Sequence, residues 1–186
     1  AARVAQCEAA FAPVLALQDR LDALGLGGLP IVAGGSPTFP THARRGRWSE
    51  LTELSPGTTV LWDAGYAKTL PDLDFLPAAV LLMRVVSRPA ANRLCLDLGH
   101  KAVASEMPPP RAVFLDLPDA VPVMHNEEHL VVETPHAARF AVGKEAYALP
   151  WHVCPTVAVH AEAWVVEGGV ARERWAVTAR ARRLTV

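Results

Sequence analysis

The chain has 186 residues, of which 51% are hydrophobic and 20% charged, with a formal net charge of −1. This balance lacks the cationic excess that neutralises phosphates, and the apolar run Leu76–Met83 is far too short to span a bilayer, which argues against nucleic-acid and membrane partners. Three widely spaced cysteines imply no disulfide framework, so we expect a cytoplasmic globular protein.

The N-terminal segment predicts a helix, a strand and a turn. Apolar residues recur every three to four positions from Val4 to Leu24, as in a helix with one buried face. Pro13 is expected to kink or divide this helix. Leu29–Ala33 predicts a short strand, and the glycine-rich turn Gly34–Thr38 follows it. Helix, strand and glycine-rich turn in this order indicate an α/β arrangement.

The rest of the chain predicts mainly strands. Ser49–Leu54 is expected to form one helical turn, and Thr58–Trp62 a second strand. Gly168-Gly169 predicts a hairpin turn between the last two strands. The further strands are predicted at Ala78–Ser87, Arg93–Leu98, Ala112–Leu117, His129–Glu133, Glu145–Leu149, Val153–His160, Ala163–Val166 and Val170–Thr178. We therefore divide the chain near residue 77 into an α/β part, residues 1–77, and an all-β domain, residues 78–186.

The segment Pro150–Thr156 places an imidazole and a thiol two residues apart. In an extended strand the side chains at i and i+2 share a face, so His152 and Cys154 are expected to coordinate one ion together. Nitrogen and soft sulfur suit zinc, and two protein ligands leave positions open for water or substrate. Ordinary packing is the alternative interpretation of this short motif.

Three further groups of polar residues have chemical potential. The exposed amides and two hydroxyls of Gly34–Thr38 predict an anion cradle, with a simple tight turn as the alternative. Asp97 and Lys101 are expected to lie on one face and form a salt bridge. The segment His125–His129 is rich in groups that move protons or bind metal, with a solvated turn as the alternative.

Seven short motifs follow one another in a characteristic order, namely Gly34-Gly35-Ser36-Pro37-Thr38, Ser55-Pro56-Gly57, Trp62-Asp63, Ser87-Arg88-Pro89, Asp97-Leu98-Gly99-His100-Lys101-Ala102, Glu127-Glu128-His129 and Pro150-Trp151-His152-Val153-Cys154-Pro155-Thr156. In this order they resemble the second half of the D-threonine aldolase / D-serine dehydratase family. These are metal-activated pyridoxal-phosphate enzymes with an alanine-racemase-like fold. The similarity extends from about Leu29 to Arg183.

The resemblance implies both a fold and a set of roles. Residues 1–77 would be the last strands and helices of a (β/α)8 barrel, and residues 78–186 the all-β domain that carries the metal site. The residues implied to bind pyridoxal 5'-phosphate are Gly34, Gly35, Ser36, Thr38 and Asp63. His152 and Cys154 would bind Zn²⁺ or another divalent metal such as Mn²⁺, and Glu128 and His129 would be catalytic.

Two departures from the family pattern are visible. The family's chemistry needs a lysine on an early barrel strand that forms a Schiff base with the cofactor, and Lys68, Lys101 and Lys144 do not occupy that place. Trp62 stands where a tyrosine is common before Asp63. We therefore expect the chain to be the C-terminal part of a longer enzyme and inactive alone. Its partners would be the N-terminal barrel half of that enzyme and a second subunit in a homodimer.

The function implied by the resemblance is a lyase acting on a β-hydroxy D-amino acid such as D-serine, D-threonine or 3-hydroxy-D-aspartate. Cys154 favours a dehydratase, because aldolase members tend to carry aspartate at this position. Two alternatives stay open at this point. One is a non-catalytic, zinc-stabilised β domain used for self-association. The other is a small metallohydrolase, which would need a third ligand such as His125, His129 or His160.

Overall fold

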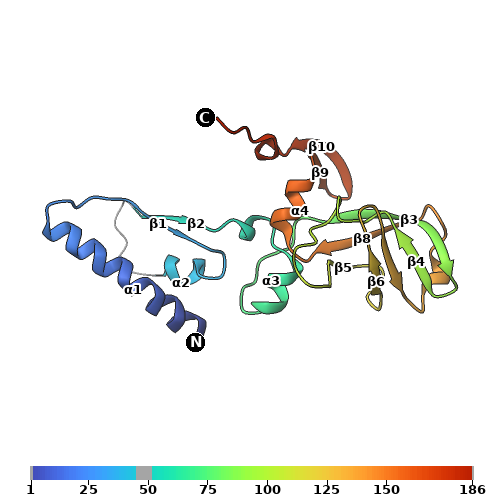
Figure 1. The fold of residues 1–186 in the computed structure, drawn as a ribbon, viewed down its shortest axis with the longest axis horizontal. Helices are drawn as coiled ribbons and strands as arrows, with labels where there is room; N and C mark the ends of the chain where they lie inside the picture. Colours follow the sequence, from blue (N-terminus) through green and yellow to red (C-terminus); the bar gives the residue numbers. More distant parts are fainter. Residues whose placement is uncertain (1, 45–51, 186) are drawn as a thin grey trace. The chain divides into compact units, whose positions relative to one another are not determined.

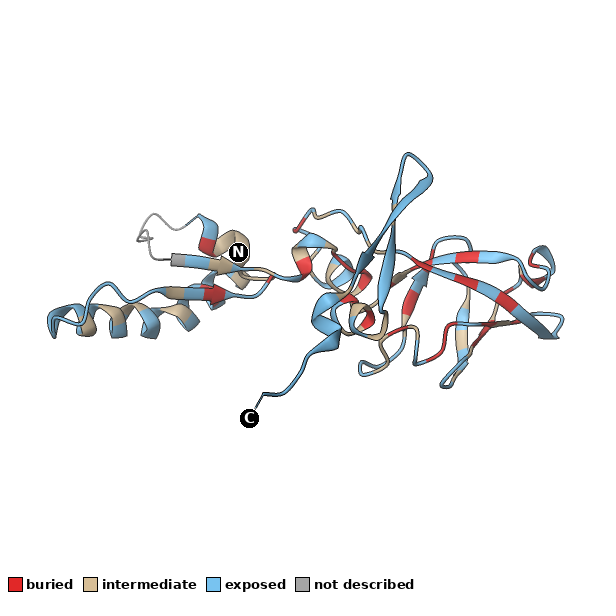
Figure 2. Cartoon of the chain, turned by 90° about the horizontal axis from the view of Figure 1, so that it is seen from above, coloured by how far each residue is buried: buried red, intermediate tan, exposed pale blue. Residues whose placement is uncertain are grey.

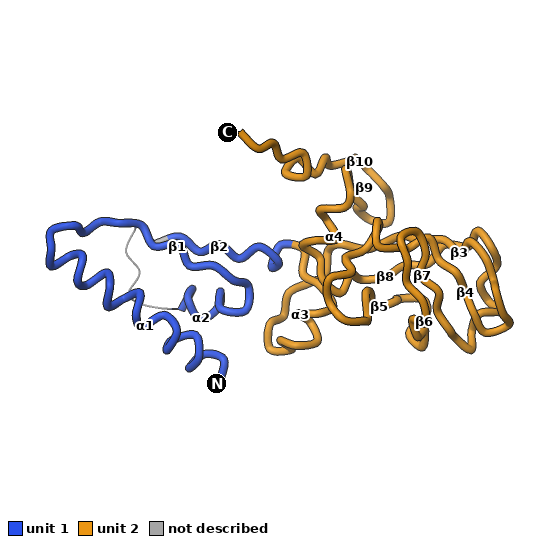
Figure 3. The backbone as a smooth tube through the Cα atoms, in the orientation of Figure 1, with its two compact units in different colours: residues 1–60 blue, residues 61–186 orange. Residues whose placement is uncertain are grey.

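The computed structural model describes residues 2–44 and 52–185. The chain divides into two compact units, unit 1 (residues 1–60) and unit 2 (residues 61–186), shown in Figures 1 and 3. This division lies earlier than the boundary near residue 77 expected from the sequence. The reason is that residues 61–77 are bound within unit 2, where the N–H of Gly65 donates to the carbonyl of Trp151 over 3.0 Å.

Unit 1 contains one long helix and a pair of parallel strands. Its elements are α1 (Ala2–Ala23), β1 (Ile31–Gly34), α2 (Phe39–Ala43), β2 (Thr52–Ser55) and the 3-10 helix η1 (Thr58–Val60). β1 and β2 run parallel, with Ile31 opposite Thr52 and Gly34 opposite Ser55. The predicted first helix and first strand are confirmed, and α1 continues through Pro13 without being divided.

The apolar stripe of α1 is buried only near the start of the helix. Cys7 is 6% exposed, and its Sγ lies 3.6 Å from Nε2 of His42. The ring of Phe11 packs against the same imidazole, with 4.7 Å between the ring centroids. Farther along the helix, Leu17 and Leu24 are 53% and 73% exposed. The predicted buried face is therefore confirmed only at Cys7, since Val4 in the first turn is also exposed.

The segment between residues 49 and 62 was predicted to form a helical turn and a strand. Residues 49–51 of the expected helical turn lie outside the described residues, and its remainder belongs to the strand β2. The strand expected at Thr58–Trp62 is wrong, because η1 occupies its first half and Trp62 has a φ of +48°. Trp62 is 1% exposed and packs 5.0 Å from the ring of Phe75. Burial of this large ring outweighs the β-propensity of the preceding residues.

Unit 2 is built on a six-stranded sheet with the strand order β5-β8-β3-β4-β7-β6. Its strands are β3 (Leu81–Ala90), β4 (Arg93–Leu96), β5 (Ala112–Phe114), β6 (Val121–His125), β7 (Leu130–Glu133) and β8 (Glu145–Pro150). All neighbours pair antiparallel. The sheet curls around its own apolar face (Figure 1). Of these strands, only β6 was not predicted.

The core of unit 2 follows the two-residue period of its strands. In β3, Leu81, Met83 and Val85 are buried, whereas Leu82 and Val86 are exposed. β8 pairs with this segment and buries its alanines against it. The most fully buried core side chains, all less than 2% exposed, include Met83, Val85, Leu94, Leu96, Leu98, Val103, Leu117, Leu130 and Val132.

Helical segments and a hairpin complete unit 2. They are α3 (Ala64–Thr69), the 3-10 helix η2 (Ala137–Arg139), α4 (Val153–Val159), the antiparallel pair β9 (Glu162–Glu167) and β10 (Val170–Ala176), and the 3-10 helix η3 (Thr178–Ala181). The hairpin turn at Gly168-Gly169 is confirmed, with φ values of +58° and +78°. Figure 2 shows the exposed surface of this hairpin. Within the described residues, no helix has the length and apolar character needed to cross a bilayer.

The strand predicted at Val153–His160 is wrong, because the segment forms α4. Its β-branched valines and threonine favoured a strand in the sequence. Pro155 is the third residue of the helix, where a backbone N–H has no intrahelical acceptor, so proline costs nothing there. A contribution that the local sequence does not contain comes from Asp63, ninety positions earlier in the chain, whose carboxylate accepts the N–H of Val153.

Candidate metal and cofactor site

One buried carboxylate holds the starts of both α3 and α4. Asp63 is 2% exposed. Its Oδ1 accepts the backbone N–H of Tyr66 over 2.8 Å, which caps α3, and its Oδ2 accepts the N–H of Val153 over 3.0 Å. These N–H groups would otherwise have no acceptor within their helices. Asp63 therefore joins the two helices and sets the backbone between His152 and Cys154.

His152 and Cys154 flank the residue that Asp63 holds. His152 is the extended N-cap residue of α4, with φ −131° and ψ 105°, and Cys154 is an exposed residue of its first turn. The expected arrangement, with both side chains on one face of a strand, is therefore wrong. The pKa of Tyr66 is raised, first by burial and then by Asp63 and Cys154, so these three side chains lie in one neighbourhood.

The imidazole of His152 has a carboxylate partner. Nδ1 of His152 lies 2.5 Å from Oε1 of Glu106, and both side chains are about half exposed. Burial raises the pKa of Glu106. Its hydrogen bonds with His152 and with its own backbone lower the pKa, as do the charges of His152 and Arg111, and together they outweigh the effect of burial. The net pKa of Glu106 lies below its ordinary value, so this acceptor is ionised at neutral pH.

These residues fit a divalent metal in two respects. An imidazole nitrogen and a thiol are ligand types that zinc prefers, and metal-bound histidines usually donate their second ring N–H to a carboxylate, as His152 does to Glu106. Within residues 2–44 and 52–185, no three His, Cys, Asp or Glu side chains gather as a complete metal cluster. Among these described residues, His152 and Cys154 are the two ligand candidates that the sequence pattern identified.

The predicted catalytic residues Glu128 and His129 lie in a polar turn. Their backbone N–H groups donate to Oδ1 of Asn126 over 3.1 and 2.8 Å. Nζ of Lys101 lies 2.5 Å from Glu128 and 3.2 Å from Glu127. These ion pairs replace the expected bridge between Lys101 and Asp97, because the carboxylate of Asp97 accepts the backbone N–H of Arg84 instead.

A single loop separates this turn from the metal-ligand candidates. Lys101, near the start of the loop between β4 and β5, contacts Glu128, and Glu106, farther along the same loop, contacts His152. The catalytic roles of Glu128 and His129 therefore stay a prediction. The hydrogen bonds of the turn itself support the solvated-turn interpretation of this segment.

His125, the last residue of β6, contacts the first part of the same loop. Its Nε2 donates to the carbonyl of Leu98 over 3.0 Å, and its ring meets that of His100 edge-on at 4.2 Å. Its Nδ1 is buried without a hydrogen-bond partner among the described residues. Burial, followed by the charge of His100, lowers the pKa of His125. A neutral imidazole is therefore preferred in the folded protein.

This preference predicts a pH dependence of stability. Because the pKa of His125 is lower in the folded than in the unfolded chain, the unfolded chain binds the proton more tightly. The free energy of unfolding should therefore fall as the pH decreases below the ordinary histidine value of 6.5. Urea unfolding on both sides of that pH should show a smaller loss in His125→Gln than in the wild type. An equal loss in both proteins would contradict this, and His136→Gln serves as the control.

The predicted phosphate loop Gly34–Thr38 belongs to unit 1. Gly35 has a φ of +93°, which favours glycine, and a side chain at Gly34 would meet no atom within 4 Å. The Thr38 hydroxyl donates to the carbonyls of Gly34 and Gly35 at 2.9 and 3.1 Å, and Ser36 is 3% exposed. The glycine backbone is thus open on one side, whereas both hydroxyls are engaged or buried.

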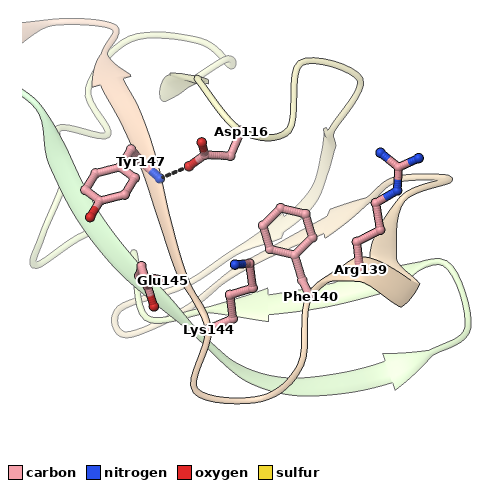
Figure 4. Close-up of a pocket in the computed structure, with 6 residues that line it drawn as sticks. All are labelled: Asp116, Arg139, Phe140, Lys144, Glu145 and Tyr147. Atoms are coloured by element: carbon pink, nitrogen blue, oxygen red, sulfur yellow. Dashed lines mark hydrogen bonds between the residues drawn. The ribbon is translucent and has the colours of Figure 1, made fainter.

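A shallow hollow lies at the opposite end of β8 from His152. It has a volume of about 360 Å³ and is lined by Asp116, Arg139, Phe140, Lys144, Glu145 and Tyr147 (Figure 4). The carboxylate of Asp116 accepts the backbone N–H of Tyr147 over 2.9 Å. None of the predicted site residues lines this hollow.

Comparison with known proteins identifies the family. Residues 78–166 match the family model described as "putative serine dehydratase domain". D-threonine aldolase from Arthrobacter sp. is 33% identical over 153 residues, or 81% of this chain and 39% of the aldolase. The chain belongs to the D-threonine aldolase / D-serine dehydratase family.

Solved structures of family members share the fold. D-threonine aldolase from Filomicrobium marinum has a TM-score of 0.77 and 28% identity over 88% of this chain and 44% of its own. D-threo-3-hydroxyaspartate dehydratase from Delftia sp. HT23, at 21% identity, matches 94% of this chain and 51% of its own with a TM-score of 0.74. The chain thus spans about half the length of these family members, and less of the Arthrobacter aldolase.

Sequence reasoning missed two residues that support the candidate site, Glu106 and Thr156. Thr156 is 3% exposed, and its hydroxyl donates to the carbonyl of His152 over 2.7 Å while accepting the N–H of Ala104 over 3.1 Å. Glu106 and Thr156 contact residues 46 and 52 positions away in the sequence. No local pattern marks such distant partners, and only the folded chain shows them.

Proposed function

We propose that this chain is the C-terminal part of a pyridoxal-phosphate- and metal-dependent lyase that acts on β-hydroxy D-amino acids. The observation that carries the proposal is the placement of His152 and Cys154 around the backbone N–H held by Asp63, with Glu106 behind the imidazole. Family membership supports the reaction class, since curated and solved relatives are named as aldolases and a dehydratase of hydroxy amino acids.

His152 and Cys154 are the residues that would hold the metal. D-threo-3-hydroxyaspartate dehydratase has been solved with alanine at a histidine and, separately, with alanine at a cysteine two positions later, the second in a metal-free form. His152 and Cys154 have the same residue types and the same spacing. When bound, a divalent metal supplies Lewis acidity at the substrate's β-hydroxyl. The chain's own task is to orient imidazole and thiol, which Asp63 and Glu106 accomplish.

The cofactor would be held by this chain only through its phosphate. The open glycine backbone at Gly34 and Gly35 suits an anion, and pyridoxal phosphate would supply an electron sink for the substrate's α-carbon. Each lysine of the chain contacts other residues: Lys68 lies over the ring of Trp151, Lys144 over that of Phe140, and Lys101 beside Glu128. The cofactor role of Asp63 stays a prediction, because both of its carboxylate oxygens accept backbone N–H groups.

The remaining parts of the proposal concern partners. The lysine that binds the cofactor covalently would come from an N-terminal half of the barrel. Residues 1–60 would supply the last strands and helices of the same barrel. The working enzyme would be a homodimer. We expect no release of aldehyde or ammonia from D-threonine or D-serine by this chain alone with metal and cofactor, and release when the barrel half is added. Turnover by the chain alone would contradict the proposal that the N-terminal half supplies the essential lysine.

Metal binding is the sharpest test of the site. Titration of the chain with Co²⁺ should give a thiolate-to-cobalt absorption band and a calorimetric binding isotherm. Both should be lost in Cys154→Ala, and the affinity should fall at least about tenfold in His152→Ala. Cys95→Ala and His136→Ala provide matched controls that should bind as the wild type does. Absence of the band in the wild type, or its persistence in Cys154→Ala, would reject this metal site.

The turnover assay with the added barrel half separates the proposal from a non-catalytic, zinc-stabilised β domain, because both would bind metal in the titration. In that case metal would raise the melting temperature of the chain, but addition of the barrel half would produce no turnover of β-hydroxy D-amino acids.

A further inference from the structure

The carboxylate of Glu106 determines which nitrogen of His152 is available. Oε1 of Glu106 lies 2.5 Å from Nδ1 of His152, and a carboxylate oxygen is a hydrogen-bond acceptor, so this contact favours the tautomer with the proton on Nδ1. A neutral imidazole carries only one ring proton. In that tautomer of the neutral ring, Nε2 of His152 presents its lone pair, the form that a metal needs.

Glu106 is held in place by the same residue that holds the backbone of His152. The buried hydroxyl of Thr156 donates to the carbonyl of His152 and accepts the N–H of Ala104, two residues before Glu106. Nε2 of His160, at the end of α4, donates to the carbonyl of Ala102 over 2.8 Å. The loop that carries Glu106 is thereby attached to both ends of α4.

A second attachment limits movement from the other side. The N–H of Trp151 donates to the carbonyl of Arg111 over 2.9 Å, so the residues on both sides of Glu106 are bound to the segment around His152. Val103, in the same loop, is fully buried in the core of unit 2. The pair of Glu106 and His152 is thus set by the fold, although both side chains reach the surface.

We propose that Glu106 is a positioning residue for the metal ligand His152, which it orients and keeps in the tautomer with the proton on Nδ1. This inference rests on the proposed metal site at His152 and Cys154. Glu106 does not touch the metal in this arrangement. Its effect is on the affinity for metal, through the orientation and basicity of the imidazole.

The experiment compares Co²⁺ binding to the wild-type chain, Glu106→Ala and Glu106→Gln by calorimetry and absorption. Glu106→Ala should bind Co²⁺ about 10–100-fold more weakly, with the thiolate band retained at saturation. Glu106→Gln should recover part of the affinity, because the amide oxygen still accepts the Nδ1 proton. Glu167→Ala, which removes an exposed carboxylate from the β9–β10 hairpin, should bind as the wild type does.

A second measurement reports the tautomer without any metal. Nitrogen–proton correlation spectra of the metal-free chain should show the ring proton of His152 on Nδ1 in the wild type and lose this preference in Glu106→Ala. Unchanged Co²⁺ affinity and tautomer in Glu106→Ala would overturn the role of Glu106 while leaving the metal site intact. A wild-type chain that binds no Co²⁺ would overturn the metal site itself, and with it the role given to Glu106.

Discussion

Replacing Asp63 with alanine is expected to lower the free energy of unfolding by about 2–4 kcal/mol, because one side chain caps two helices. Loss of a helix N-cap typically costs about 1 kcal/mol, and a buried N–H left without an acceptor adds about 1–3 kcal/mol. Asp63 provides both oxygens to such groups, the N–H of Tyr66 and that of Val153. The starts of α3 and α4 should loosen together.

Urea unfolding of unit 2, followed by tryptophan fluorescence, measures this loss. Asp63→Asn should lie between the wild type and Asp63→Ala, since one oxygen remains and the amide nitrogen opposes a backbone donor. Asp74→Ala removes an exposed carboxylate from the loop after α3 and should change stability by less than about 0.5 kcal/mol. If Asp63→Ala destabilises the chain no more than Asp74→Ala does, the double cap is not a significant source of stability.

Gly99→Ala is expected to be similarly damaging, for a steric reason. A Cβ at this buried position would overlap the backbone carbonyl of Glu127 and the carbonyl carbon of Glu128. Neither group can rotate away as a side-chain end would, so the loop and the turn must separate. That movement would stretch the hydrogen bonds from His100 to Asn126 and from Lys101 to Glu127. We expect a loss of about 3 kcal/mol, within the range of severe core substitutions.

The matched control for this substitution is Gly57→Ala. A Cβ at Gly57 meets no atom within 4 Å, so only a small change, within about 0.5 kcal/mol, is expected. Thermal and urea unfolding of the two variants measure the difference directly. A Gly99→Ala variant as stable as Gly57→Ala would show that the loop and the turn can move apart at little cost.

The sequence predicted the sheet of unit 2 well, because its information is local. The alternation of Leu81, Met83 and Val85 with exposed neighbours marks β3 wherever its partners lie. α4 is the opposite case. Val153, Thr156 and Val157 favour a strand, and the acceptor that starts the helix lies on Asp63. Hydrogen bonds between distant residues cannot be inferred from residue periodicity.

The candidate site shows the same division. The residue types at positions 152 and 154, together with the resemblance to a known family, predict a metal site, and that prediction depends on no backbone geometry. The assumption of an extended backbone was wrong, since His152 is an N-cap residue and Cys154 is helical. Glu106 escaped notice because a lone glutamate before Met107 and a run of prolines has no distinguishing pattern.

Because Asp63 caps α4 from outside the helix, the start of the helix does not depend on the side chains at positions 152 and 154. The imidazole of His152 makes no capping hydrogen bond of its own, and the start of the helix relies on the carboxylate supplied from outside it. Residue types at positions 152 and 154 can therefore be exchanged while the backbone that presents them keeps its shape. Cys154→Asp would test whether one substitution changes the metal preference of the proposed site while the backbone stays the same.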